Sequence, residues 1–155
     1  MQELKGNKTL SGTWAEIWYN GFKIAEATKI AAKVTVNRED VQIGMDVDTK
    51  ITGQKGEGTL TLVKAFTRFE DVRRDISKGK DPRGTIITKL KDPDATGGQT
   101  ERYQIGNVAF SEFGLEWEKG AVVKQEYPFA FTPSDMVLLD EISCLLYTSD
   151  AADEL

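Results

Sequence analysis

The sequence predicts a mainly β fold: a β-sandwich or partly closed barrel with one flanking α-helix and a long extended hairpin arm. Three observations support this class. Several segments alternate apolar and polar residues with a period of two, which is the period of a half-buried strand. Only residues 67–78 carry apolar residues at a helical spacing. Residues 41–58 are rich in glycine and charge and offer little to a core.

The first predicted element is a hairpin. Residues 13–19 are aromatic and alternating, and residues 22–27 form the returning strand. Asn20 and Gly21 separate the two strands. This dipeptide is typical of a type I′ turn, because both of its central positions require a positive φ.

The next strand, residues 30–37, leads into the unusual stretch at residues 41–58. The strand has one apolar face, formed by Ile30, Ala32, Val34 and Val36. We interpret residues 41–58 as an extended hairpin arm or a long loop, and long loops in compact domains are usually functional or disordered. The alternative to a functional arm is a mobile surface loop. The glycines of residues 52–58 lack the spacing of a phosphate-binding loop, so a phosphate site is not expected.

A strand at residues 59–66 precedes the single predicted helix, residues 67–78. Leu60 and Leu62 lie on one face of that strand. Thr67 and Glu70 have the spacing of a capping box, which predicts that the helix begins at Thr67. Gly79 predicts its end. The apolar stripe of the helix consists of Phe69, Val72 and Ile76.

Three further strands complete the prediction of about seven strands and one helix. They are expected at residues 84–91, 102–110 and 122–131. In the last of them, one face carries Val123, Tyr127, Phe129 and Phe131. Residues 92–98 faintly resemble a calcium-binding loop, but ordinary Asp and Gly turn chemistry explains them better.

The composition argues against most kinds of catalytic and metal-binding site. The chain has no histidine and one cysteine, Cys144. Histidine is the commonest general base and metal ligand near neutral pH, and zinc needs nitrogen or sulfur ligands. We therefore predict that the protein is not an enzyme and needs no cofactor or metal. No apolar run reaches the roughly 20 residues of a membrane span, so no membrane anchor is expected.

The last residues of the chain resemble a sequencing artefact. Residues 144–154 match the translation of a sequencing-library adapter, and such segments are excluded from fold reasoning. We predict one native domain at residues 1–142 and a non-native scar at residues 143–155, with the true C-terminus cut somewhere after Ile142. Removing three acids of the scar from the 25 leaves 22 against 20 bases, so the net charge moves from -5 to -2. The alternative is a genuine acidic, frayed terminus.

An ordered set of motifs then carries a family resemblance. These motifs occupy residues 10–21, 34–40, 48–60, 88–94, 128–131 and 139–142. Together they resemble phage tail tube proteins of the PBSX-like prophage type (the XkdM family), which occur in contractile tails and related bacteriocins. The resemblance covers nearly all of residues 8–142, and the order of the motifs is more specific than any one of them.

This resemblance implies a structural function. Tail tube subunits of this type are β-sandwich proteins with a flanking helix and a long hairpin, and they form hexameric rings that stack into a hollow tube. The implied partners are further copies of the chain and the tail sheath, tape-measure and baseplate proteins. DNA would pass through the lumen without specific binding. The implied location is the virion tail, assembled in the host bacterial cytoplasm.

Ring and stacking contacts need sheet edges and protruding segments, which the stretch at residues 41–58 can supply. The predicted subunit-interface residues are Met45, Asp46, Asp48, Lys50, Lys55 and Glu57. Two other functions are compatible with the sequence. One is an Hcp-like type VI secretion tube protein. The other is a small-molecule-binding β-barrel, which would need a deep apolar cavity inside the monomer.

Overall fold

The computed structural model describes residues 5–143 of the chain. Contacts between residues divide this part into two compact units. The first unit contains residues 5–25, 86–104 and 137–143, and the second contains residues 26–85 and 105–136. Residues 144–155, nearly all of the predicted scar, lie outside the described part. The division into a native domain at residues 1–142 and a scar at residues 143–155 stays a prediction.

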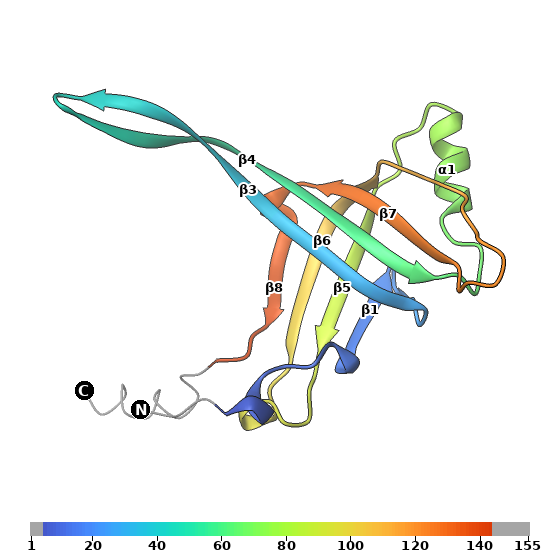
Figure 1. The fold of residues 1–155 in the computed structure, drawn as a ribbon. Helices are drawn as coiled ribbons and strands as arrows, with labels where there is room; N and C mark the ends of the chain where they lie inside the picture. Colours follow the sequence, from blue (N-terminus) through green and yellow to red (C-terminus); the bar gives the residue numbers. More distant parts are fainter. Residues whose placement is uncertain (1–4, 144–155) are drawn as a thin grey trace. The chain divides into compact units, whose positions relative to one another are not determined.

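Strands dominate residues 5–143 (Figure 1). They are β1 (Ala15–Tyr19), β2 (Phe22–Lys23), β3 (Ala27–Ile43), β4 (Asp46–Val63), β5 (Gly84–Leu90), β6 (Glu101–Phe110), β7 (Lys124–Phe131) and β8 (Met136–Asp140). One α-helix, α1, spans Glu70–Ser77, and the 3-10 helices are short. The predicted class, mainly β with one helix and a long hairpin, is confirmed.

In the first unit the strands follow the order β2-β1-β5-β6-β8. Asn20 and Gly21 join β1 to β2 with φ of 49° and 86°, so the predicted type I′ turn is confirmed. The returning strand is shorter than predicted, because the pairing ends at Lys23 and Ala27 already belongs to β3. Strand β8 was not predicted at all.

Asp92 organises the loop that follows β5. Its side chain is 5% exposed, and its two carboxylate oxygens accept backbone N–H bonds from Ser11 and Asp94, each at 2.9 Å. These bonds are the turn chemistry expected for this loop. Among the described residues, no group of three or more acids, cysteines or histidines could hold a metal ion.

The second unit has the strand order β6-β7-β4-β3 and contains a large apolar core. Its buried side chains include Leu60, Leu62, Ile105, Val108, Phe110, Tyr127, Phe129 and Phe131. The predicted apolar face of β4 is therefore confirmed, and that of β7 is confirmed at Tyr127, Phe129 and Phe131. Val123, predicted on the same face, precedes β7 and is half-buried. Two glycines of β4 let the rings of β7 lie directly on the strand: a Cβ at Gly56 would stand 2.6 Å from the Phe131 ring, and one at Gly58 would stand 2.4 Å from the Phe129 ring.

Helix α1 begins three residues later than predicted. Its N-cap is Phe69, which has a left-handed backbone with φ of 62°, and Thr67 does not cap it. The reason is tertiary: the Phe69 ring is buried against Phe110 and Tyr127, with centroids 4.5 and 4.9 Å apart. This aromatic packing overrides the local capping signal.

The end of α1 follows the prediction. The Gly79 N–H donates to the Ile76 carbonyl and the Lys80 N–H donates to the Asp75 carbonyl. Together with the positive φ of Gly79, 83°, these two bonds form a Schellman cap.

A part-buried ion pair lies beside the helix and gives a pH-dependent prediction. Arg68 donates from Nε and Nη2 to the two carboxylate oxygens of Glu26, whose side chain is 6% exposed. The hydrogen bond from Arg68 lowers the pKa of Glu26. Because this folded-state pKa is depressed, the stabilisation is present above the unfolded pKa of about 4.3 and is lost as the pH falls through the folded value.

Arg68→Met is therefore expected to cost about 2 kcal/mol at neutral pH, and the cost should fall as the pH is lowered below the unfolded pKa of about 4.3. Melting temperatures of the wild type and the variant across this range check the expectation. Arg83→Met, which removes an exposed pair with Asp81, is the control and should show little effect at any pH. A penalty for Arg68→Met that does not change with pH would contradict this role.

Candidate assembly interface

The stretch predicted as an arm or a loop is a hairpin of two continuous strands. β3 and β4 are 17 and 18 residues long, and a two-residue turn at Gly44 and Met45 joins them. β4 pairs with β7 only over residues 56–63. Within the described part of the chain, residues 35–55, here called the arm, pair only with one another. Figure 1 shows this end of the hairpin projecting beyond β7.

The charged residues predicted for the interface share one face of this hairpin. Pairing places Asp46, Asp48 and Lys50 opposite Ile43, Val41 and Glu39. Lys55 and Glu57 lie opposite Thr35 and Lys33, which are on the same face because they have the same parity along β3.

A β-bulge makes this shared face possible. The register skips Thr52, so the face changes from even to odd positions along β4. The Thr52 hydroxyl donates to the Asn37 carbonyl at 3.3 Å. Sequence periodicity alone does not reveal the bulge.

The six predicted residues do not all lie on the free arm. Met45, at the turn, is 98% exposed. Lys55 closes the arm, and its ammonium lies 2.7 Å from Glu57. This hydrogen bond raises the pKa of Lys55 and lowers the pKa of Glu57. Glu57 itself belongs to the part of β4 that pairs with β7, opposite Ala130.

The arm also exposes apolar side chains that the sequence reading missed. Their exposed fractions are 38% for Val41, 58% for Ile43, 59% for Val47 and 56% for Ile51. All four are β-branched residues, which favour strands, and they lie among the glycines and charged residues of the segment. The strand register places Val41 and Ile43 on the face of Asp46 and Asp48, and Val47 and Ile51 on the opposite face, so both faces of the arm expose apolar side chains.

The outer edge of β3 is a second candidate contact. β3 is last in the strand order, so among residues 5–143 no strand pairs with this edge. A long unpaired edge presents backbone N–H and C=O groups to another chain, and natural proteins usually cover such an edge. The arm and this edge together form a surface suited to association.

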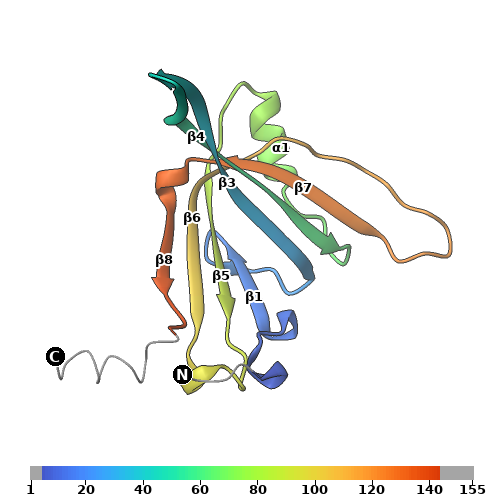
Figure 2. The ribbon, with the colours of Figure 1, turned by 60° about the vertical axis from the view of Figure 1, so that its left-hand side comes forward.

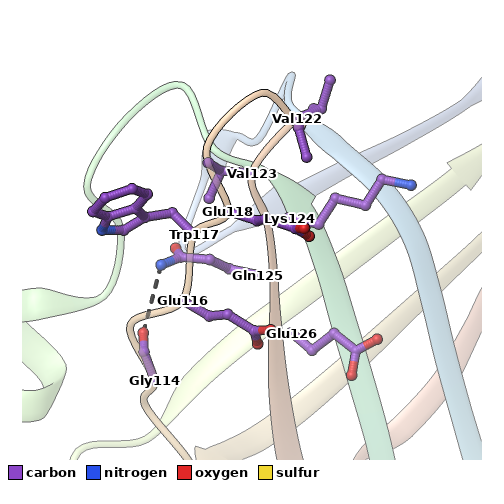
Figure 3. Close-up of a pocket in the computed structure, with 10 residues that line it drawn as sticks. Gly114, Glu116, Trp117, Glu118, Val122, Val123, Lys124, Gln125 and Glu126 are labelled. Atoms are coloured by element: carbon purple, nitrogen blue, oxygen red, sulfur yellow. Dashed lines mark hydrogen bonds between the residues drawn. The ribbon is translucent and has the colours of Figure 1, made fainter.

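The β6–β7 loop, residues 111–123, extends from the other end of β7 (Figure 2). It lines a hollow of about 440 Å³ together with the start of β7. Figure 3 shows Trp117 and Val122 on opposite sides of this hollow, and the Gln125 amide donates to the Gly114 carbonyl. Trp117 is 67% exposed and Val122 is 70% exposed, so this loop is also more suited to a protein contact than to a small ligand.

No helix in the described part of the chain has the length and apolar character needed to cross a membrane.

Comparisons with known proteins agree with an assembly role. A family model described as phage tail tube protein matches residues 2–140. The phage-like element PBSX protein XkdM of Bacillus subtilis (strain 168) is 31% identical over 139 residues, which cover 86% of this chain and 93% of that protein.

Solved structures share the fold at low sequence identity. The sheath/tube terminator of an extracellular contractile injection system, PVC, has a TM-score of 0.69 at 10% identity, covering 84% of this chain and 96% of that chain. The tube terminating cap of the anti-feeding prophage has a TM-score of 0.69 at 7% identity, covering 90% and 97%. A chain of the PVC sheath-tube complex has a TM-score of 0.67 at 10% identity, covering 86% and 93%. The match of sequence and fold over most of the chain shows that the protein belongs to the phage tail tube protein family.

Proposed function

We propose that this chain builds the tube of a phage tail as hexameric rings stacked around a central lumen, without catalysing a reaction. Further copies of the chain are its first partners, and the tail sheath, tape-measure and baseplate proteins are the others. DNA passes through the lumen without specific binding. The rings assemble in the host bacterial cytoplasm, and the finished tube is part of the virion tail.

One observation carries this proposal: no other described strand pairs with the arm or with the outer edge of β3. A ring needs a heterologous contact that closes, and stacking needs a second one that stays open. The long edge suits the first contact, and the projecting arm suits the second. The similar structures are a sheath/tube terminator, a chain of a sheath-tube complex and a tube terminating cap.

Balanced charge on the hairpin is compatible with a lumen that does not retain DNA. Lys33 lies opposite Glu57, and Glu39 lies opposite Lys50. Binding to DNA is driven by neutralisation of phosphates by bases. Bases that already face acids contribute less to such binding, and the net charge of -2 expected without the scar adds a weak repulsion.

Charge reversal on the arm tests the proposal. Asp48→Lys and Lys50→Glu are each expected to block ring stacking, because the same unfavourable contact recurs at every interface of a symmetric assembly. Each variant should change the free energy of unfolding by at most about 1 kcal/mol, since exposed charges contribute little to a monomer.

Melting curves and sedimentation of the two variants separate folding from assembly, and the two opposite reversals control for net charge. Normal tubes from both variants would remove this arm from the interface. The edge of β3 and the β6–β7 loop would then remain as candidate contacts.

A further inference from the structure

The chain after β8 is held by one side chain of the β5–β6 loop, residues 91–100. The backbone N–H of Ser143 donates to Oε1 of Gln99 at 3.0 Å, and Nε2 of Gln99 donates to the backbone carbonyl of Ser143 at 3.0 Å. A primary amide offers the same donor and acceptor as the backbone of a residue in a neighbouring strand. The Gln99 amide therefore pairs with the backbone of position 143 as a strand would.

The loop fixes the Gln99 amide in this orientation. Nε2 also donates to the Thr96 carbonyl at 2.6 Å, so the amide nitrogen faces two carbonyl oxygens. Exchanging the amide nitrogen and oxygen would lose all three bonds. The loop itself is held by the buried carboxylate of Asp92 and by the Gly98 N–H, which donates to the carbonyl of the buried Ala95. Gln99 thus extends from a loop with its own network of hydrogen bonds.

The two bonds between Gln99 and position 143 do not depend on the side chain at position 143. Both use backbone atoms of Ser143, which is half-buried, so its backbone groups need partners there. Any residue except proline, which lacks the N–H, can make both bonds. The contact therefore does not require serine, although Ser143 is the first residue of the predicted scar.

Strand β8, which ends at Asp140 just before this contact, is an exposed edge strand. Within residues 5–143 it pairs with β6 alone, and Figure 2 shows β6 on one side of it. Val137, Leu138 and Leu139 are 44%, 40% and 45% exposed, and consecutive residues of a strand point to opposite faces. An unpaired edge with apolar side chains on both faces invites pairing with another chain.

We infer that Gln99 is a clamp that holds the end of β8 in place, and that it thereby prepares β8 as a strand that a second copy of this chain covers. The choice of a second copy rests on the proposed function, because copies of one chain build the tube. The clamp rests on the hydrogen bonds of Gln99 alone. Gln99 is thus a positioning residue: it contacts the chain beyond β8 and affects association through the order of β8.

Hydrogen exchange in dilute monomers tests the clamp. Gln99→Leu is expected to raise the exchange rate of residues 137–142 at least about tenfold, because the end of β8 then opens locally, and to leave Leu60 and Leu62 unchanged. Ser143→Pro should act in the same direction, because it removes one donor of the clamp and leaves the loop intact. Ser143→Ala is the matched control and should exchange as the wild type does. Unchanged exchange of residues 137–142 in both Gln99→Leu and Ser143→Pro would overturn the clamp.

Tube formation by the full chain tests the covering of β8. Leu138→Lys is expected to raise the protein concentration needed for tubes at least about tenfold, because it places a charge in a covered apolar contact. Ile76→Lys is the control, since Ile76 is 41% exposed, about as much as Leu138, but lies on α1 in the other unit. Gln99→Leu should raise the threshold by a smaller factor, because β8 must then become ordered on association. Melting curves confirm that each variant is folded.

The outcomes separate this inference from the proposed function. Tubes that form from Leu138→Lys at the wild-type concentration would overturn β8 as a covered strand. An unchanged threshold for Gln99→Leu would overturn the effect of the clamp on assembly. Wild-type protein that forms neither rings nor tubes would overturn the proposed function, while exchange in the monomer would still decide the clamp. Faster exchange at β8 together with raised thresholds for both variants would support the inference.

Discussion

Gly58→Ala is expected to lower the free energy of unfolding by about 2–3 kcal/mol, although it adds a single methyl group. The added Cβ would stand 2.4 Å from Cζ of Phe129 and 2.5 Å from the Ala31 carbonyl oxygen. Phe129 is 2% exposed and packs against Phe110 and Phe131, so its ring has little room to move. The backbone oxygen cannot move without breaking the pairing of β3 with β4.

Thermal unfolding checks this expectation. For a chain of 155 residues, the loss should lower the melting temperature by roughly 5–10 °C. Gly53→Ala is the matched control in the same strand, because its Cβ would meet only the Asn37 side chain at 4.0 Å. That variant should be neutral or slightly stabilising. Equal melting temperatures for the two variants would contradict the claim that the Phe129 ring needs the space that a Cβ at position 58 would fill.

The second large effect concerns protection of the arm from hydrogen exchange. In isolated monomers, amides of residues 39–50 should exchange orders of magnitude faster than those of Leu60 and Leu62 in the same strand. The arm is a two-stranded hairpin, which is marginally stable in water, whereas Leu60 and Leu62 pair with strands on both sides.

Assembly should largely remove this difference in exchange rate. On polymerisation, protection of residues 39–50 is expected to approach that of Leu60, because a neighbouring copy then covers them. Exchange measured by mass spectrometry on dilute monomers and on tubes gives both values. Arm amides that are already as protected as Leu60 in the monomer would mean that the arm is stable by itself and does not depend on a partner.

Local chemistry allowed some elements to be predicted residue by residue. The turn at Asn20 and Gly21 and the stop at Gly79 depend on backbone conformations that few residues adopt, so the sequence alone identifies them. The apolar faces of β4 and β7 were equally clear, since alternation reports burial on one side of a strand.

Other features depend on contacts that the local sequence does not encode. The start of α1 was wrong because Phe69 takes a left-handed backbone to reach an aromatic cluster. The glycines at positions 56 and 58 were read as signs of a loop, yet they lie in a strand beneath the rings of β7. Strand β8, Met136–Asp140, was missed because its first four residues are consecutive apolar residues and show no alternation.

The candidate interface was predicted in outline. The sequence indicated an arm and its charged residues, and the structure places the five charged ones on one face of the hairpin. It could not indicate the bulge at Thr52 or the apolar side chains that the arm leaves exposed. These features arise from strand register and from the packing of distant segments. The assignment of Met45, Asp46, Asp48, Lys50, Lys55 and Glu57 to a subunit contact stays a prediction.

Electron microscopy of the purified chain tests the central claim most directly. Negatively stained protein, examined over a range of concentrations with sedimentation in parallel, is expected to show rings with six-fold symmetry and a hollow centre that stack into tubes. The same assemblies should form when residues 143–155 are removed. Monodisperse monomers at every concentration, with melting curves that show a folded protein, would contradict the claim that this chain builds a tail tube.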